Sequence, residues 1–210
     1  MTMPNDSSYR ILKHFFLRFF FLCILLTLPV ICIRVDILYL HNELSEQSLT
    51  EYLQELFLFG DILIFTYAAY SSFYVRRFCV LLVGFFACLL VRELDGLFDL
   101  ISHGFWIYPA LIIAVSSIVY ALQQKQQTID AFCLFVQSHN FISMCLGIGI
   151  LFVFSRLFGM GSLWNGLQHN PERLVKNVAE EGTESLGYII IFSLVLLIYL
   201  TLTLKKQAII

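Results

Sequence analysis

The chain has 210 residues, of which 59% are hydrophobic and only 13% are charged, so it is far more apolar than a soluble domain. Its formal net charge of −2 argues against a nucleic-acid-binding surface. The composition therefore predicts an all-α, polytopic transmembrane helix bundle in contact with a lipid bilayer.

Six stretches approach the length that a membrane span needs, because a helix rises about 1.5 Å per residue and about 20 apolar residues cross the hydrocarbon core. They are residues 15–35, 54–75, 78–100, 104–123, 129–158 and 176–204. Pro29 and Pro109 predict kinks in the first and fourth spans. We expect one transmembrane bundle over residues 1–210, with no separate soluble domain.

The first apolar stretch follows Arg10, Lys13 and Arg18, as a signal peptide would, but no small-x-small cleavage site comes after it. We therefore interpret it as a retained membrane anchor. Residues 36–53 contain several acidic residues and no lysine or arginine after Arg34, which predicts an acidic periplasmic loop.

Lysine and arginine residues predict the orientation, because short cytoplasmic segments are enriched in them. With a cytoplasmic N-terminus and six spans, the C-terminus is also cytoplasmic, and Trp106 and Trp164 fall at the outer interface, where tryptophan is favoured. The cytoplasmic ends then contain most of the basic residues: Arg10, Lys13, Arg18, Arg76, Arg77, Lys125, Lys205 and Lys206.

Charged residues interrupt the third predicted span near its periplasmic end. In a continuous helix, Arg92, Asp95, Asp99 and His103 have the spacing i, i+3, i+7 and i+11 and share one face. Glu93 points about 100° away from this face.

The last predicted span begins with the same spacing of charges. Asn170 is a candidate N-cap and Pro171 suits the first helical turn. Four residues share the stripe: Arg173, Lys176, Glu180 and Glu184.

Antiparallel packing of the third and sixth spans allows the two stripes to pair. In the register that places Arg92 opposite Glu184, three further pairs follow: Asp99 with Lys176, Asp95 with Glu180, and His103 with Arg173. Only the pairs of Arg92 with Glu184 and of Asp99 with Lys176 are complementary, whereas the other two place a carboxylate beside a carboxylate and a histidine beside an arginine. An unpaired charge in the membrane costs about 2.5–3.5 kcal/mol or more on an insertion scale, which favours the complementary pairs.

Glu93 and Glu181 point away from the stripes, so we expect them to address Asp61 of the second span or Arg156 of the fifth. The predicted buried charged cluster consists of Asp61, Arg92, Glu93, Asp95, Asp99, His103, Arg156, Lys176, Glu180, Glu181 and Glu184.

Three interpretations of this cluster remain open at the level of sequence. The first is a buried ion-pair network that orders the helices. The second is a divalent metal site for zinc, iron or manganese, with Asp99, His103, Glu180 and Glu184 as ligands. The third is a proton or ion relay.

Small residues form a stripe on the fourth span: Ala110, Ala114, Ser117 and Ala121. Gly182, Thr183 and Gly187 likewise leave space beside the charged part of the last span. Small residues allow helices to approach closely, within the chain, in a homo-oligomer or with a membrane partner.

Two short motifs give a resemblance to known proteins. Arg92-Glu93-Leu94-Asp95 and the segment from Glu180 to Tyr188 (EEGTESLGY) resemble the R-E-x-D and E-E-x-x-E-x-x-G segments of a loose group of uncharacterised bacterial six-helix inner-membrane proteins. The resemblance implies a bacterial inner membrane and six helices, and it supplies no catalytic residues to carry over to this chain.

Together these patterns predict a multi-pass inner-membrane protein that acts in binding, sensing or assembly rather than as an enzyme. The alternatives are a metal-dependent membrane enzyme acting on a lipid or a small periplasmic molecule, and an ion- or proton-coupled transport component.

Overall fold

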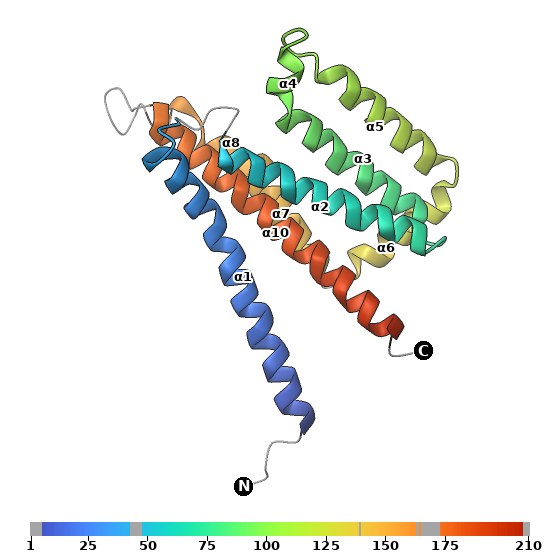
Figure 1. Cartoon of the computed structure of the whole chain (residues 1–210). Helices are drawn as coiled ribbons and strands as arrows, with labels where there is room; N and C mark the ends of the chain where they lie inside the picture. Colours follow the sequence, from blue (N-terminus) through green and yellow to red (C-terminus); the bar gives the residue numbers. More distant parts are fainter. Residues whose placement is uncertain (1–5, 43–47, 139, 163, 165–172, 208–210) are drawn as a thin grey trace.

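The computed structural model describes residues 6–42, 48–138, 140–162, 164 and 173–207, and every regular element in these ranges is a helix (Figure 1). The all-α prediction is confirmed. The principal helices in chain order are α1 (Asp6–Leu38), α2 (Leu49–Ser71), α3 (Arg76–Glu93), α4 (Asp95–Asp99), α5 (Ile107–Leu122), α6 (Lys125–Val136), α7 (Asn140–Gly149), the π-helix η1 (Ile150–Phe154), α8 (Ser155–Phe158) and α10 (Arg173–Gln207).

Four helical stretches in the described part of the chain are long and apolar enough to cross a membrane: 8–38, 49–71, 140–158 and 174–200. A fifth follows if α5 and α6, which meet at an angle of 99°, form one broken span. Helix α3 carries Arg76, Arg77, Arg92 and Glu93 at its ends, which lowers its apolar character. The described helices therefore provide four candidate spans, or five with the broken one, and the predicted number of six is not confirmed.

Helix α2 lies between α3 and α10, and α5 packs on the other side of α3 (Figure 1). Helix α7 packs against α10, while α1 contacts α2 and α10 near its own C-terminal end and diverges from them toward its N-terminus. The first described residues of α1 and the last turns of α10 lie at the same end of the bundle (Figure 1).

The end of α1 caps the start of α2. The Asp36 carboxylate is fully buried and accepts hydrogen bonds from the Leu49 N–H (2.8 Å), the Thr50 N–H (3.0 Å) and the Thr50 hydroxyl (2.7 Å). Ser48 is the N-cap, and its hydroxyl accepts from the Glu51 N–H. Part of the predicted acidic loop is therefore helical, because these caps satisfy the first N–H groups of α2.

The third predicted span does not continue as one helix to residue 100. Helix α3 ends at Glu93, and the chain resumes as the short α4. A turn follows in which Gly104 has a φ of +77°, a conformation that glycine adopts at little cost, and its N–H donates to Asp99 Oδ1 (2.9 Å). The stripe from Arg92 to His103 therefore lacks the continuous helix that its spacing assumed.

The fifth predicted span is divided as well. Helix α6 ends at Val136 and α7 begins at Asn140, and between them the Ser138 hydroxyl donates to the Phe135 carbonyl (2.6 Å). Such a side-chain hydrogen bond competes with helix continuation, so the polar residues between α6 and α7 separate the two helices.

The two prolines do not end their helices. Pro29 lies within α1, which continues to Leu38. Helix α5 begins at Ile107, so Pro109 lies in its first turn, where the backbone N–H has no partner within the helix and proline is tolerated.

Aromatic contacts join the helices in the core. The rings of Phe65 and Phe86 stack at 5.6 Å between α2 and α3, and those of Phe57 and Phe192 lie 5.0 Å apart between α2 and α10. By contrast, phenylalanines on α1 such as Phe15 and Phe20 are exposed, as expected for side chains that contact lipid.

Candidate functional site: a buried polar network

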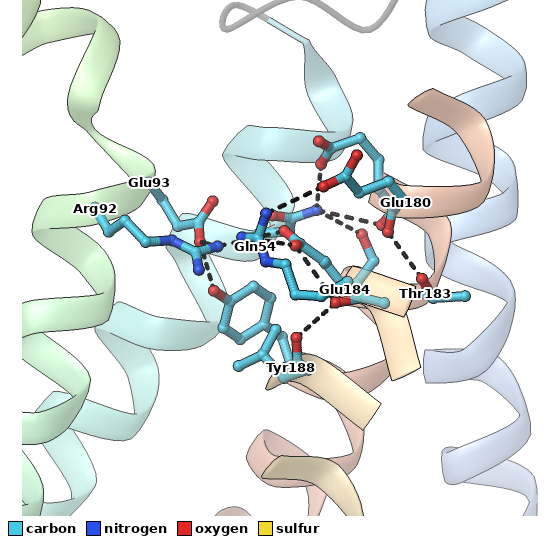
Figure 2. A network of polar contacts seen from close by, with 12 residues as sticks. Gln54, Arg92, Glu93, Glu180, Thr183, Glu184 and Tyr188 are labelled. Atoms are coloured by element: carbon cyan, nitrogen blue, oxygen red, sulfur yellow. Dashed lines mark hydrogen bonds and ion pairs between the residues drawn. The ribbon is translucent and has the colours of Figure 1, made fainter. Parts of the chain in front are cut away.

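The α10 sequence places polar side chains on two adjacent faces of one helix. Lys176, Glu180, Glu184 and Tyr188 follow one another at intervals of four residues and line one face. Glu181 and Ser185 occupy the neighbouring face, and the Ser185 residue is fully buried. These side chains meet partners from α2, α3 and α8, and together they form the polar network of Figure 2.

Glu184 is the centre of this polar network, and its side chain is only 4% exposed. Arg92 of α3 places Nη2 3.4 Å from Glu184 Oε2, and Arg156 of α8 places Nη2 3.1 Å from Glu184 Oε1. The Ser155 hydroxyl lies 3.5 Å from Glu184 Oε1 and donates to the Leu151 carbonyl. Each carboxylate oxygen of Glu184 thus faces an arginine from a different helix.

Arg92 also pairs with its chain neighbour Glu93, at 2.7 Å between Nη2 and Oε1. The same Glu93 oxygen accepts a hydrogen bond of 2.6 Å from the hydroxyl of Tyr188, which is 1% exposed. Figure 2 shows Arg92 and Glu93 extending from α3 toward Glu184 and Tyr188 of α10. These contacts join α3 to α10 through both charged and neutral donors.

At one end of the network, the basic side chains of Arg156 and Lys176 are exposed at the surface of the bundle. Arg156 Nη1 lies 3.1 Å from Glu180 Oε1, and Lys176 Nζ lies 3.7 Å from Glu180 Oε2. The Arg156 side chain is 48% exposed, whereas that of Glu180 is 20% exposed. The network therefore has an accessible end at Arg156 and a buried end at Tyr188.

Helix α2 joins the network through Gln54, which is fully buried. Its Nε2 donates to Glu181 Oε2 (3.0 Å) and to the Ser185 hydroxyl (2.9 Å). The network of described residues therefore contains four carboxylates, three cations and two neutral donors from α2 and α10. These are Glu93, Glu180, Glu181 and Glu184, then Arg92, Arg156 and Lys176, and then Gln54 and Tyr188.

Glycines allow α10 and the α7–η1 segment to approach closely enough for these contacts. A Cβ on Gly187 would lie 3.1 Å from Leu151 Cβ and 3.2 Å from the Gly147 carbonyl oxygen. The π-helix η1 lies in the same place, directly before Ser155 and Arg156, and such π-segments are frequent at functional sites.

The structure brings together seven of the predicted cluster residues: Arg92, Glu93, Arg156, Lys176, Glu180, Glu181 and Glu184. Arg92 lies opposite Glu184, as the proposed register placed it. The other pairs of that register are not formed between described side chains, because α4 leaves the line of α3. Asn170 and Pro171 lie outside the described residues, as does the Arg173 side chain.

Asp99 and His103 form a local pair beyond the end of α3. His103 Nδ1 lies 2.8 Å from Asp99 Oδ2, and the His103 side chain is 97% exposed. The Gly104 N–H and the His103 ring lower the pKa of Asp99, since both stabilise its carboxylate. Asp95, on α4, makes no ion pair with the polar network among the residues that the structure describes.

The proposed metal ligands do not converge. Asp99 and His103 pair with each other, whereas Glu180 and Glu184 have their oxygens directed toward Arg156, Arg92 and Lys176. Within the described ranges, no three His, Cys, Asp or Glu side chains are grouped as metal ligands.

Several members of the network were missed at the level of sequence: Gln54, Ser155, Ser185 and Tyr188. The sequence does carry a signal for Gln54, because this residue shares a helix face with the apolar Phe57 and Leu58 of α2. Arg156 was expected beside Glu93 or Glu181, but it binds Glu180 and Glu184.

Asp61 is separate from the network contacts described above. It lies in α2, is 1% exposed, and neither carboxyl oxygen has a hydrogen-bond partner in the described part of the chain. The expected contact with Glu93 or Glu181 is not formed.

Fold and site together define a helical membrane protein with a buried, branched polar network between its helices. Comparison of the chain with protein-family models, with curated proteins and with solved structures gives no match.

Proposed function

We propose that the protein is a multi-pass component of a bacterial inner membrane that acts in binding, sensing or assembly, without catalysing a reaction. In this proposal the polar network holds α2, α3, α8 and α10 in one arrangement, and a ligand or a partner protein acts through its accessible end. The resemblance of the two short motifs to bacterial inner-membrane proteins agrees with this location.

The single observation that carries the proposal is the double pairing of Glu184. Arg92 and Arg156 come from different helices and approach different oxygens of the same buried carboxylate. A carboxylate held in this way is poorly accessible to a substrate, because an arginine faces each of its oxygens and the side chain is almost fully buried. It is well placed to couple the positions of α3 and α8 to that of α10.

For the topology we propose six spans with both termini in the cytoplasm, counting α3 and α5 as spans. The placement of lysine and arginine supports this orientation. The first described residues of α1 and the last turns of α10 lie at one end of the bundle, which fits an even number of spans (Figure 1). The network then lies near the periplasmic side.

A photo-reactive residue at Leu157 would test for a partner at the accessible end, since this side chain is 59% exposed beside Arg156. We expect cross-linking of the full-length protein in cells to give a defined adduct that is lost on Glu184→Gln. The matched control is Ile112, which is 71% exposed on α5 and should give only lipid adducts.

Metal analysis and proton flux distinguish the other functions. Stoichiometric zinc, iron or manganese in the purified protein, lost on Asp99→Ala or Glu184→Ala, would overturn the proposal in favour of a metal-dependent enzyme. Proton flux in liposomes that disappears with Glu93→Gln would instead favour a transport component.

A further inference from the structure

Two buried aspartates of this protein lie in opposite environments. Asp36 is fully buried at the start of α2 and accepts three hydrogen bonds from Leu49 and Thr50. Asp61 is equally buried in the middle of α2, yet neither of its carboxyl oxygens has a hydrogen-bond partner among the described residues. Of these two aspartates, only Asp36 has the hydrogen-bond donors that a buried carboxylate requires.

The surroundings of Asp61 along α2 are apolar. Phe57 and Phe65 lie one turn before and one turn after it on the same helix face, and both are buried. Phe57 contacts Phe192 of α10, and Phe65 stacks on Phe86 of α3. Asp61 therefore has packed aromatic rings one helical turn away on its N-terminal side and on its C-terminal side.

Contacts of α2 with α1, α3 and α10 show which segments of these three helices lie opposite Asp61. Helix α10 runs parallel to α2, since Gln54 meets Ser185 and Gly60 meets Phe192, while α3 and α1 run antiparallel to it. The titratable or charged groups on these stretches are Cys23 of α1, Cys88, Arg92 and Glu93 of α3, and Glu184 and Tyr188 of α10. None of them is a hydrogen-bond partner of Asp61.

A carboxylate at membrane depth is unfavourable unless cations or hydrogen-bond donors surround it. Arg92 and Tyr188 are already directed toward glutamates, so they do not supply this compensation. The neutral acid avoids the cost of burying a charge, because a bound proton replaces the missing cation.

We propose that Asp61 is a proton-binding site in the middle of the bundle, occupied in the arrangement seen here. The ligand is a proton taken from water, and its release requires α2 to separate from α3 and α10 so that water reaches the carboxylate. The nearest part of the polar network on α2 is Gln54, on the same helix face and about 10 Å away along the helix axis. The site thus links proton binding to helix packing, independently of the function proposed for the network.

Infrared spectroscopy of the full-length protein in phosphatidylcholine nanodiscs tests this directly. We expect a carbonyl band of a neutral carboxylic acid at neutral pH that shifts on ¹³C-labelling of aspartate and is absent from Asp61→Asn. Asp36→Asn serves as the matched control and should retain the band. If the labelled wild-type protein shows only ionised aspartate, the proposal is overturned, whether or not the variant folds.

Thermal unfolding at different pH values gives a second test. Because folded Asp61 would hold its proton more tightly than the unfolded chain, the wild-type midpoint should fall relative to Asp61→Asn as pH rises from mildly acidic to mildly alkaline. A difference between the two proteins that stays constant over this range would overturn the proposal. Neither measurement depends on metal content, on proton flux or on a partner at Arg156, so its failure is distinguishable from that of the proposed function.

Discussion

Glu184 shows how one residue can organise a membrane bundle. Its carboxylate contacts arginines from α3 and α8, and a serine hydroxyl lies at the limit of hydrogen-bonding distance. Removal of one partner from such a site is expensive, because it leaves a buried charge with less compensation. The contributions of Arg92 and Arg156 are therefore coupled through the carboxylate that they share.

A double-mutant cycle on Arg92 and Glu184 measures this coupling. We expect Arg92→Ala and Glu184→Ala each to lower the free energy of unfolding by about 1–3 kcal/mol, and the double variant to cost about 1 kcal/mol less than their sum. Denaturation in mixed micelles provides the measurement. Arg92→Ala combined with Asp130→Ala, on the distant α6, should be additive; additivity for the first pair would exclude their direct interaction.

Tyr188 gives a second prediction for a single residue. Its hydroxyl donates to Glu93 over 2.6 Å in a buried site, so Tyr188→Phe removes a charge-assisted hydrogen bond while the ring is retained. We expect a loss of about 1–3 kcal/mol in the free energy of unfolding. The control Tyr108→Phe, at a residue that is 65% exposed, should change stability little. Equal stability of both variants would show that the Tyr188 hydroxyl is dispensable.

At the scale of the helices, the close contact of α10 with the α7–η1 segment depends on glycines, which have no side chain to separate the two backbones. Gly147 and Gly187 face each other across this contact, and a Cβ on Gly187 would lie 3.2 Å from both the Gly147 carbonyl oxygen and the Leu151 backbone nitrogen. Small residues are the usual means by which membrane helices approach one another, since closer packing increases dispersion contacts. This approach places Ser155 and Arg156 beside Glu184.

Two alanine substitutions test this arrangement. Gly187→Ala should destabilise the protein by about 1–3 kcal/mol, because the new Cβ meets Leu151 and the Gly147 carbonyl within 3.2 Å. Gly149→Ala is the matched control: nothing lies within 4 Å of its Cβ position, and its helical φ of −64° suits alanine. It should stabilise the helix by about 0.5–1 kcal/mol. Thermal unfolding in detergent compares the two, and similar losses would contradict the close contact.

For the whole molecule, topology decides which side of the membrane the network serves. The proposed six spans place residues 72–75 in the cytoplasm and residues 100–106 in the periplasm, together with cytoplasmic termini. Single cysteines at Ser72 and Ser102, in a protein whose six native cysteines are replaced by alanine, test this with a membrane-impermeant maleimide. We expect labelling in intact cells at Ser102 and not at Ser72, and the opposite pattern would reverse the orientation of the network.

The sequence by itself determined the apolar all-α character of the protein and the residues that require compensation in a membrane. Both follow from composition, because long apolar stretches form helices in lipid and buried charges need partners. Spacing also placed Arg92 opposite Glu184, since these two residues themselves lie within regular helix, Arg92 in α3 and Glu184 in α10.

The tertiary structure alone decided the rest. The break at Leu94, whose ψ of 17° departs from helical geometry, removed Asp95, Asp99 and His103 from the predicted stripe, and the Gly104 turn with its hydrogen bond to Asp99 follows the end of α4. Helix packing also selected Gln54 and Tyr188 as partners and left Asp61 without one. Such choices depend on which faces of separate helices meet, and intervals along one chain do not contain that information.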